Sequence, residues 1–221
     1  MAKAHASIPQ DLQQVEKMQT YYQFHAKIYD LTRWSFLFGR DAIIDHALQA
    51  APESRSILEV GCGTGHNLVK LAENFTKAKI IGMDVSAQML EKARENTDAF
   101  QAQLVLEEKA YEKGEYSWTG KLDMILFSYS LSMINPFWRE LLAQAHKDLR
   151  PGGIIAVVDF HDSPLGWFKK HMGNNHVRMD GHIMPVLKEL FQTEFEEISR
   201  AYLGVWKYFR FVGIKKRQPT F

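Results

Sequence analysis

The chain has 221 residues, of which 46% are hydrophobic and 24% are charged, as in a soluble globular protein with one domain or one domain and a cap. The formal net charge of +1 gives no basic signature, so we expect no nucleic-acid partner. The single cysteine excludes an intrachain disulfide, and no window approaches the roughly 18 apolar residues of a membrane span. We therefore expect a cytoplasmic protein that is soluble or lies on the inner face of a membrane.

The first part of the chain predicts a helical cap over residues 1–50. Within residues 11–48, apolar side chains recur at spacings of three and four: Leu12, Val15, Met18, Tyr21 and Tyr22. Pro52 then breaks the chain before a different pattern begins.

From Arg55 onward, short apolar strands alternate with helices. The expected strands cover residues 56–60, 79–84, 103–107, 122–128 and 154–159. The expected helices cover 66–75, a segment from an N-cap at Ser86 to Asn96, and a segment from an Asn135 cap with Pro136 at its first position to about Leu149. Continuous apolar strands alternating with helices predict a parallel sheet that is covered on both faces.

The last part of the chain differs. Residues 194–203 and 205–215 predict two strands joined around Gly204, which form an antiparallel hairpin at one edge of the sheet. Residues 160–192 predict an insertion that caps the carboxyl edge. The whole prediction is an α/β, Rossmann-like, doubly wound and mostly parallel seven-stranded sheet over residues 51–221.

The sharpest motif is Glu59-Val60-Gly61-Cys62-Gly63-Thr64-Gly65, which follows an expected strand and opens an expected helix. Glycines let backbone amides approach a ligand closely, and the helix start offers free N–H groups. A dinucleotide fingerprint has its third glycine one position later. Asp84 ends the next strand, 19 residues past Gly65, where a carboxylate can accept both hydroxyls of a ribose. The competing interpretation is a turn that only packs a helix on a strand.

These features resemble the class I S-adenosylmethionine-dependent methyltransferases from Ile57 through Asp159, including the Leu149-Arg150-Pro151-Gly152-Gly153 turn. The resemblance implies S-adenosylmethionine as cofactor and S-adenosylhomocysteine as product. Gly61, Gly63 and Gly65 would line the methionine, Asp84 would bind the ribose, and Val85 and Met89 would face the adenine. The full cofactor set is Tyr29, Arg33, Glu59, Gly61, Cys62, Gly63, Thr64, Gly65, Asn67, Asp84, Val85, Met89, Lys109, Ala110, Ser128 and Tyr129.

One position departs from the family pattern. Where the family often has an acidic residue before an alanine, this chain has Lys109-Ala110. A lysine cannot accept a hydrogen bond from the adenine amine, so the Ala110 backbone or Glu108 would have to serve.

A narrower resemblance involves the segments 29–33, 38–41, 128–134, 138–139 and 158–160. They are similar to the bacterial N-methyltransferases of betaine-lipid synthesis, which trimethylate a diacylglyceryl-homoserine amine. Those enzymes are related to phosphatidylethanolamine N-methyltransferases and to quinone C-methyltransferases. The resemblance implies a lipid headgroup as methyl acceptor. The alternatives are N-methylation of phosphatidylethanolamine, methylation of a quinone or other small molecule on carbon or oxygen, and a cofactor-binding module without catalysis.

Methyl transfer needs alignment more than reactive side chains, because the cofactor supplies the leaving group. Tyr22, Tyr29 and Tyr129 are the candidate catalytic residues, since aromatic faces can hold cationic groups near a sulfonium. Each could equally be a core aromatic. Arg33 lies one helical turn after Tyr29 and could pair with a carboxylate, or it could be a surface residue.

The insertion carries His161, His176, Arg178 and His182, which we interpret as a headgroup pocket in competition with a purely structural loop. Their spacing matches no familiar metal site, so we expect no metal. Trp167-Phe168-Lys169-Lys170 mixes aromatic and basic residues and predicts weak peripheral contact with an anionic membrane.

Overall fold

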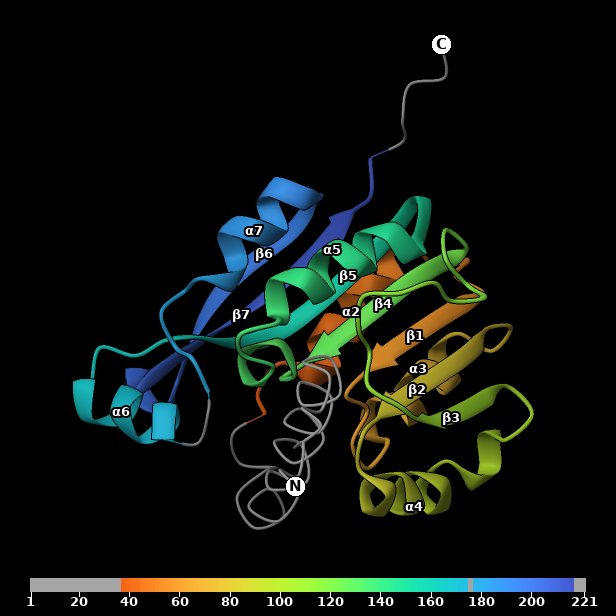
Figure 1. Cartoon of the computed structure of the whole chain (residues 1–221), viewed down its shortest axis with the longest axis horizontal. Helices are drawn as coiled ribbons and strands as arrows, with labels where there is room; N and C mark the ends of the chain where they lie inside the picture. Colours follow the sequence, from red (N-terminus) through yellow and green to blue (C-terminus); the bar gives the residue numbers. More distant parts are fainter. Residues whose placement is uncertain (1–36, 175–176, 217–221) are drawn as a thin grey trace, which may run out of the picture.

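The computed structural model describes residues 37–174 and 177–216, which form a seven-stranded sheet with helices on both faces (Figure 1). The strand order is β3-β2-β1-β4-β5-β7-β6. The strands are β1 (Ser56–Val60), β2 (Lys79–Asp84), β3 (Leu104–Glu108), β4 (Leu122–Ser128), β5 (Leu149–Asp162), β6 (Gln192–Ala201) and β7 (Trp206–Ile214). The first five pair in parallel, and β7 runs antiparallel to both β5 and β6, so the predicted mostly parallel sheet and its antiparallel hairpin are confirmed.

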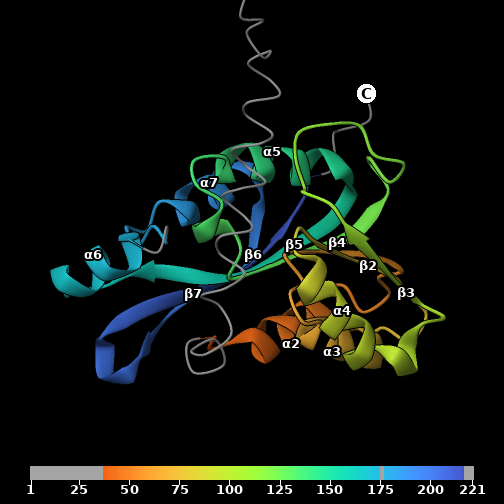
Figure 2. The same ribbon diagram turned by 60° about the horizontal axis from the view of Figure 1, so that its bottom comes forward.

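The helices divide between the two faces of the sheet (Figure 2). One layer holds α2 (Arg40–Ala50), α3 (His66–Asn74) and α4 (Ala87–Asn96), and the other holds α5 (Trp138–Asp148) and α7 (Ile183–Leu190). The short α6 (Gly166–Asn174) follows β5 at the far end of the sheet. Short 3-10 turns, at Asp98–Phe100, Leu131–Met133 and Tyr202–Gly204, complete the elements.

The apolar strand pattern explains the layers, because side chains on both faces of the central strands are buried. In β1, Ile57 packs into the core under α2 and α3, whereas Leu58 packs into the core under α5 and α7. Along α2, Ile43, Ile44 and Ala47 are fully buried in the first of these cores. Helix α2, which belongs to the expected cap, therefore packs on the same face of the sheet as α3. Residues 1–36 lie outside the described residues.

The strand order also locates the binding edge. The chain steps outward from β1 to β2 and β3, then returns to place β4 on the other side of β1. In open α/β sheets, ligands bind at the carboxyl ends of the strands beside such a reversal. The glycine-rich turn follows β1, and Asp84 ends β2, so both stand at this edge.

One local prediction was wrong and another was incomplete. Helix α5 begins at Trp138 rather than at Pro136, because the Asn135 side chain donates to the Ser132 carbonyl oxygen at 2.7 Å instead of capping the helix. The Asn135–Pro136 peptide bond is cis. The insertion also does more than cap the carboxyl edge, since α7 lies along the sheet face beside α5, with Ile183 and Leu187 buried there. Among the described residues, no helix is long and apolar enough to cross a bilayer.

Candidate functional site

The glycine-rich turn is tied to the end of β2 by its own backbone. The amides of Gly61 and Cys62 both donate to the Met83 carbonyl oxygen, at 2.8 and 3.0 Å. The next amide, that of Gly63, donates to Oδ2 of Asp84 at 2.8 Å. The turn is therefore fixed against the neighbouring strand before any ligand binds.

Asp84 keeps capacity for a ligand despite these contacts. Its Oδ1 accepts from the Ser86 amide at 3.0 Å, and its Oδ2 accepts from the Gly63 amide. Two carboxylate oxygens offer about four acceptor sites, so each can still take a hydroxyl donor. Lys109, which directly follows β3, is joined to Asp84 through its amide, which donates to the Asp84 carbonyl oxygen at 3.0 Å.

Gly61 and Gly65 have different reasons to be glycine. Both have positive φ, at 75° and 81°. A Cβ on Gly61 would lie 3.0 Å from Cβ of Ser130, which lines the pocket. A Cβ on Gly65 would instead meet Ala93 and Thr97 at 3.2 Å, so this residue lets α3 pack closely on α4. The structure therefore does not place Gly65 with the two earlier glycines on the pocket wall.

A cavity opens at this edge of the sheet. It contains most of the predicted cofactor residues that the structure describes: Glu59, Gly61, Cys62, Gly63, Thr64, Asn67, Asp84, Val85, Met89, Lys109, Ala110, Ser128 and Tyr129. It also contains residues that sequence reasoning missed: Leu37, Arg40, Val60, His66, Met83, Ser86, Tyr111, Ser130, Met133 and Ile134. Of the missed residues, Ser86 and His66 stand one residue outside predicted motifs, and Ser130, Met133 and Ile134 belong to the segment 128–134 of the narrower resemblance. Tyr111 lies in a loop without a sequence signal.

The cavity floor is polar and buried. The Asn67 amide Nδ2 donates to Oε1 of Glu59 at 2.6 Å, which orients both side chains at the base of α3. The hydroxyls of Ser128 and Ser130 and the Oδ1 of Asn67 are buried and have no hydrogen-bond partner among the described residues. Buried polar atoms normally have partners, so these three atoms fit a polar ligand.

Asp159 anchors the loop that follows β4. This fully buried carboxylate accepts from the Ser132 amide at 3.0 Å, from the Ser132 hydroxyl and from the Phe160 amide at 2.7 Å. Burial raises the pKa of Asp159 to about 6, while these hydrogen bonds oppose the increase. The loop beside it supplies Ser130, Met133 and Ile134 to the cavity wall.

Tyr129 lines the cavity with its hydroxyl already engaged. The hydroxyl donates to the Phe38 carbonyl oxygen at 2.8 Å, and burial raises the pKa of Tyr129, which keeps the phenol protonated. The backbone at Tyr129 has φ of 55°, a left-handed conformation that is uncommon outside glycine. Its ring meets Phe160 edge-on at 4.8 Å. The hydroxyl thus joins the loop after β4 to the segment before α2.

The residues predicted for a headgroup pocket do not line this cavity. His161 lies against Gly181, with 3.1 Å between its Cε1 and an added Cβ. His182 is bonded to Asp180 and packs edge-on against Trp138, and Arg178 donates to the same carboxylate at 2.8 Å. These contacts hold the loop in place, and Arg178 lines a second cavity together with Trp138 and Asp180. Tyr22, Tyr29, Arg33 and His176 lie outside the described residues.

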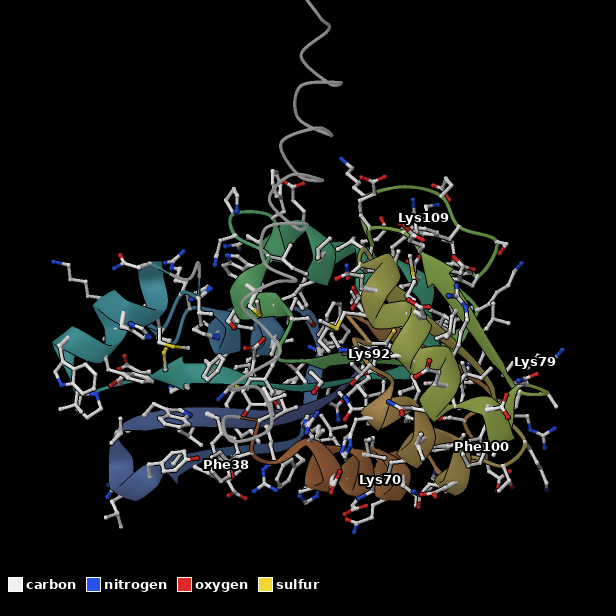
Figure 3. The ribbon with its side chains drawn as sticks, turned by 90° about the horizontal axis from the view of Figure 1, so that it is seen from below. Phe38, Lys70, Lys79, Lys92, Phe100 and Lys109 are labelled. Atoms are coloured by element: carbon white, nitrogen blue, oxygen red, sulfur yellow. The ribbon has the colours of Figure 1, made fainter. Side chains whose placement is uncertain are left out.

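Lys109 lines the cavity at the carboxyl end of β3. Its ammonium lies over the Tyr116 ring, 5.0 Å from the centroid. This side chain is labelled in Figure 3, beside the end of α4. The cation–π contact gives the charge a partner within the protein.

Comparison with known sequences matches residues 57–153 to the methyltransferase domain family. A trans-aconitate 2-methyltransferase from Deinococcus radiodurans is 33% identical over 145 residues, which cover 65% of this chain and 48% of that protein. A carboxy-S-adenosyl-L-methionine synthase from Photorhabdus laumondii is 27% identical over 132 residues, covering 57% of this chain and 52% of that protein. The chain thus spans about half the length of the curated relatives that it matches.

Solved structures show the same architecture. The N-methyltransferase NodS from Bradyrhizobium japonicum, in complex with S-adenosylhomocysteine, superposes with a TM-score of 0.70 at 15% identity, covering 89% of this chain and 99% of that one. The 1,6-didemethyltoxoflavin-N1-methyltransferase from Burkholderia thailandensis gives 0.69 at 12% identity, covering 98% and 94%. Residues 57–153 therefore match a methyltransferase domain, and the described part of the chain has the fold seen in these two methyltransferase structures.

Proposed function

We propose that this protein transfers the methyl group of S-adenosylmethionine to an acceptor molecule. The observation that carries the proposal is the hydrogen bond between the Gly63 amide and Asp84, which sets a glycine turn and a ribose-binding carboxylate side by side in one cavity. The unpartnered hydroxyls of Ser128 and Ser130 provide further donors and acceptors for a zwitterionic methionine group.

The cofactor, when bound, supplies a methyl carbon whose bond to the sulfonium breaks with both electrons remaining on sulfur. The acceptor lone pair forms the new bond to that carbon, and an amine acceptor must first release its proton to solvent. The chain contributes alignment and exclusion of water. Met133 and Ile134 make the wall beside Ser130 apolar, and desolvation of an ammonium lowers its pKa and favours the reactive neutral amine.

The acceptor that we propose is the amine of a lipid headgroup of the diacylglyceryl-homoserine type. The segment 128–134, which carries part of the resemblance to betaine-lipid N-methyltransferases, forms the cavity wall after β4. Arg40, at the start of α2, also lines the cavity. A guanidinium suits the carboxylate of a homoserine headgroup. Arg40 would therefore pair with that carboxylate, the role that the sequence suggested for Arg33.

Transfer of label from methyl-tritiated S-adenosylmethionine tests both the methyl-transfer activity and the identity of the acceptor. The full chain is incubated with a bacterial lipid extract or with the aqueous extract of the same cells, and Asp84→Ala serves as the inactive control. Label in a chloroform-soluble amine that depends on Asp84 supports the lipid acceptor. Asp84-dependent label in a water-soluble carboxylic ester, as the trans-aconitate relative suggests, would retain methyl transfer and overturn the lipid. No transfer to either extract would overturn the activity.

A further inference from the structure

An apolar surface surrounds the end of the β6–β7 hairpin. Six large apolar side chains of the described residues are exposed, and four of them lie here. We call these four residues the hairpin patch: Phe38, Trp167, Tyr202 and Leu203. Trp167 is 67% exposed and Leu203 fully exposed, although both side chains are costly to leave in water.

The rings of the hairpin patch belong to one aromatic cluster. Phe38 meets Tyr202 edge-on at 5.4 Å, and Tyr202 lies 4.7 Å from the buried Trp206. Trp206 stacks on Phe168 at 5.4 Å, and Phe168 in turn meets Trp167 at 5.7 Å. Figure 3 labels Phe38 beside the hairpin, far from Lys79 at the other end of the sheet. Buried aromatics therefore support the exposed ones from beneath.

The backbone holds two of these residues at the tip of the hairpin. Tyr202 and Leu203 have φ of 47° and 57°, a left-handed conformation that L-residues seldom adopt outside turns. Residues with positive φ occur at the centre of hairpin turns, where they match the twist of the flanking strands. The turn therefore presents the exposed side chains of Tyr202 and Leu203 at the end of the β6–β7 hairpin.

The charge around the hairpin patch is positive. Segments 163–174 and 198–214 contain no aspartate or glutamate. They carry Lys169, Lys170, Arg200, Lys207 and Arg210, of which Lys169 pairs with Asp162 at 2.8 Å and Arg210 pairs with Glu197 at 2.7 Å. Exposed apolar rings surrounded by cations match the interface of an anionic bilayer rather than a purely apolar protein groove.

The hairpin patch borders the cavity. The carbonyl oxygen of Phe38 accepts the hydroxyl of Tyr129, and Leu37 and Arg40 on either side of Phe38 and Gly39 line the cavity wall. A surface that touches a bilayer at Phe38 would bring the cavity mouth to the headgroup layer. The sequence had pointed to Trp167-Phe168-Lys169-Lys170, but Phe168 is buried and Lys169 is paired, so the contact surface differs.

We propose that the hairpin patch docks the protein on an anionic lipid surface. This proposal rests on the proposed lipid methyl transfer, because docking would bring the lipid substrate to the cavity. Its test measures vesicle binding and not turnover. The full chain is sedimented with vesicles of phosphatidylcholine containing phosphatidylglycerol, at low and high salt. The patch variant is Trp167→Ser with Leu203→Ser, and Val105→Ser, an exposed valine on edge strand β3, is its control.

The wild-type chain and Val105→Ser should bind these vesicles equally, and the patch variant should bind at least about tenfold more weakly. Lys170→Gln and Lys207→Gln should each lose about fivefold at low salt, whereas Lys77→Gln and Lys79→Gln should lose nothing. All variants replace exposed side chains, except for the half-buried Lys207, and they should keep the same circular dichroism and the same S-adenosylhomocysteine affinity. Because the fold and the S-adenosylhomocysteine affinity are measured separately from vesicle binding, a loss of vesicle binding can be told apart from a failure of the proposed function.

Equal sedimentation of the wild-type and patch variants, or no sedimentation of the wild type at low salt, would overturn the proposal. Sedimentation velocity tests the remaining alternative, in which a second copy of the chain covers the hairpin patch. If the wild type is a dimer and the patch variant a monomer, then a second copy of the chain covers this surface, and the lipid assignment is refuted.

Discussion

The amide of Gly63 and the carboxylate of Asp84 lie 2.8 Å apart, so one hydrogen bond joins the turn after β1 to the end of β2. The same carboxylate holds the Ser86 amide at the start of α4. Three separate elements of the cavity are therefore positioned by one side chain, so this part of the described site is ordered without a ligand. Preorganisation of this kind raises affinity because less conformational entropy is lost on binding.

Gly61→Ala should weaken S-adenosylhomocysteine binding by about tenfold, a loss of about 1.4 kcal/mol. The new Cβ would stand 3.0 Å from Cβ of Ser130 and would displace the loop after β4. Gly120→Ala is the matched control, since Gly120 has φ of 73° but no atom within 4 Å of an added Cβ. Both variants should lose about 1 kcal/mol of stability from the left-handed backbone, measured by urea unfolding.

Adding Ser130→Gly to Gly61→Ala should restore part of the affinity, because it removes the atom that the new Cβ meets. If both glycine variants bound the ligand like the wild type, the contact between the turn and Ser130 would not shape the cavity.

Tyr129→Phe should raise the acceptor KM and lower turnover several-fold while the cofactor Kd changes less than about twofold. The lost hydroxyl holds the Phe38 carbonyl oxygen and with it the segment that contributes Leu37 and Arg40 to the cavity. Ser54→Ala is the control, because the Ser54 hydroxyl also donates to a backbone carbonyl, that of Ala51 at 2.8 Å, and Ser54 does not line the cavity. Unchanged steady-state kinetics in Tyr129→Phe would make this hydroxyl a packing feature alone.

The buried carboxylate of Asp159 should make stability fall as pH rises. Its pKa is raised from 3.8 to about 6, so the folded protein holds a proton that the unfolded chain has released between about pH 4 and 6. The free energy of unfolding should therefore drop across that window by roughly 3 kcal/mol relative to Asp159→Asn, which cannot titrate. Urea midpoints measured from pH 4 to 7 would show this. Parallel pH profiles for wild type, Asp159→Asn and the exposed control Asp98→Asn would contradict it.

Much of the fold could be predicted because local patterns coincide with it. Strand β4 reads Leu-Asp-Met-Ile-Leu-Phe-Ser and is buried on both faces, as a continuous apolar run indicates. Ser86 caps α4 as expected, and its hydroxyl accepts from the Met89 amide at 3.3 Å. Asn135-Pro136 led to the wrong helix start because both residues favour the first positions of a helix. In the structure, the Asn135 side chain instead donates to the Ser132 carbonyl oxygen in the preceding turn. A competing local hydrogen bond of that kind is not visible in the sequence.

The site was predictable where one continuous motif builds it, from Glu59 to Asn67 and at Asp84. It was not predictable where distant segments meet. Arg40 reaches the cavity because α2 packs on the sheet beside α3, and Ser130 does so because Asp159 fixes its loop. The histidines of the insertion invited a ligand role by composition alone, whereas the structure gives His182 the carboxylate of Asp180 as its partner.

Calorimetric titration of S-adenosylmethionine into the full chain and into Asp84→Ala tests the central claim most directly, with the exposed substitution Glu91→Gln on α4 as control. We expect one site with a Kd in the micromolar range for the wild type and Glu91→Gln, and a loss of at least about 30-fold in Asp84→Ala, since two charge-assisted hydrogen bonds disappear. No binding of S-adenosylmethionine by the wild type, together with NADH binding that depends on Asp84, would contradict the account.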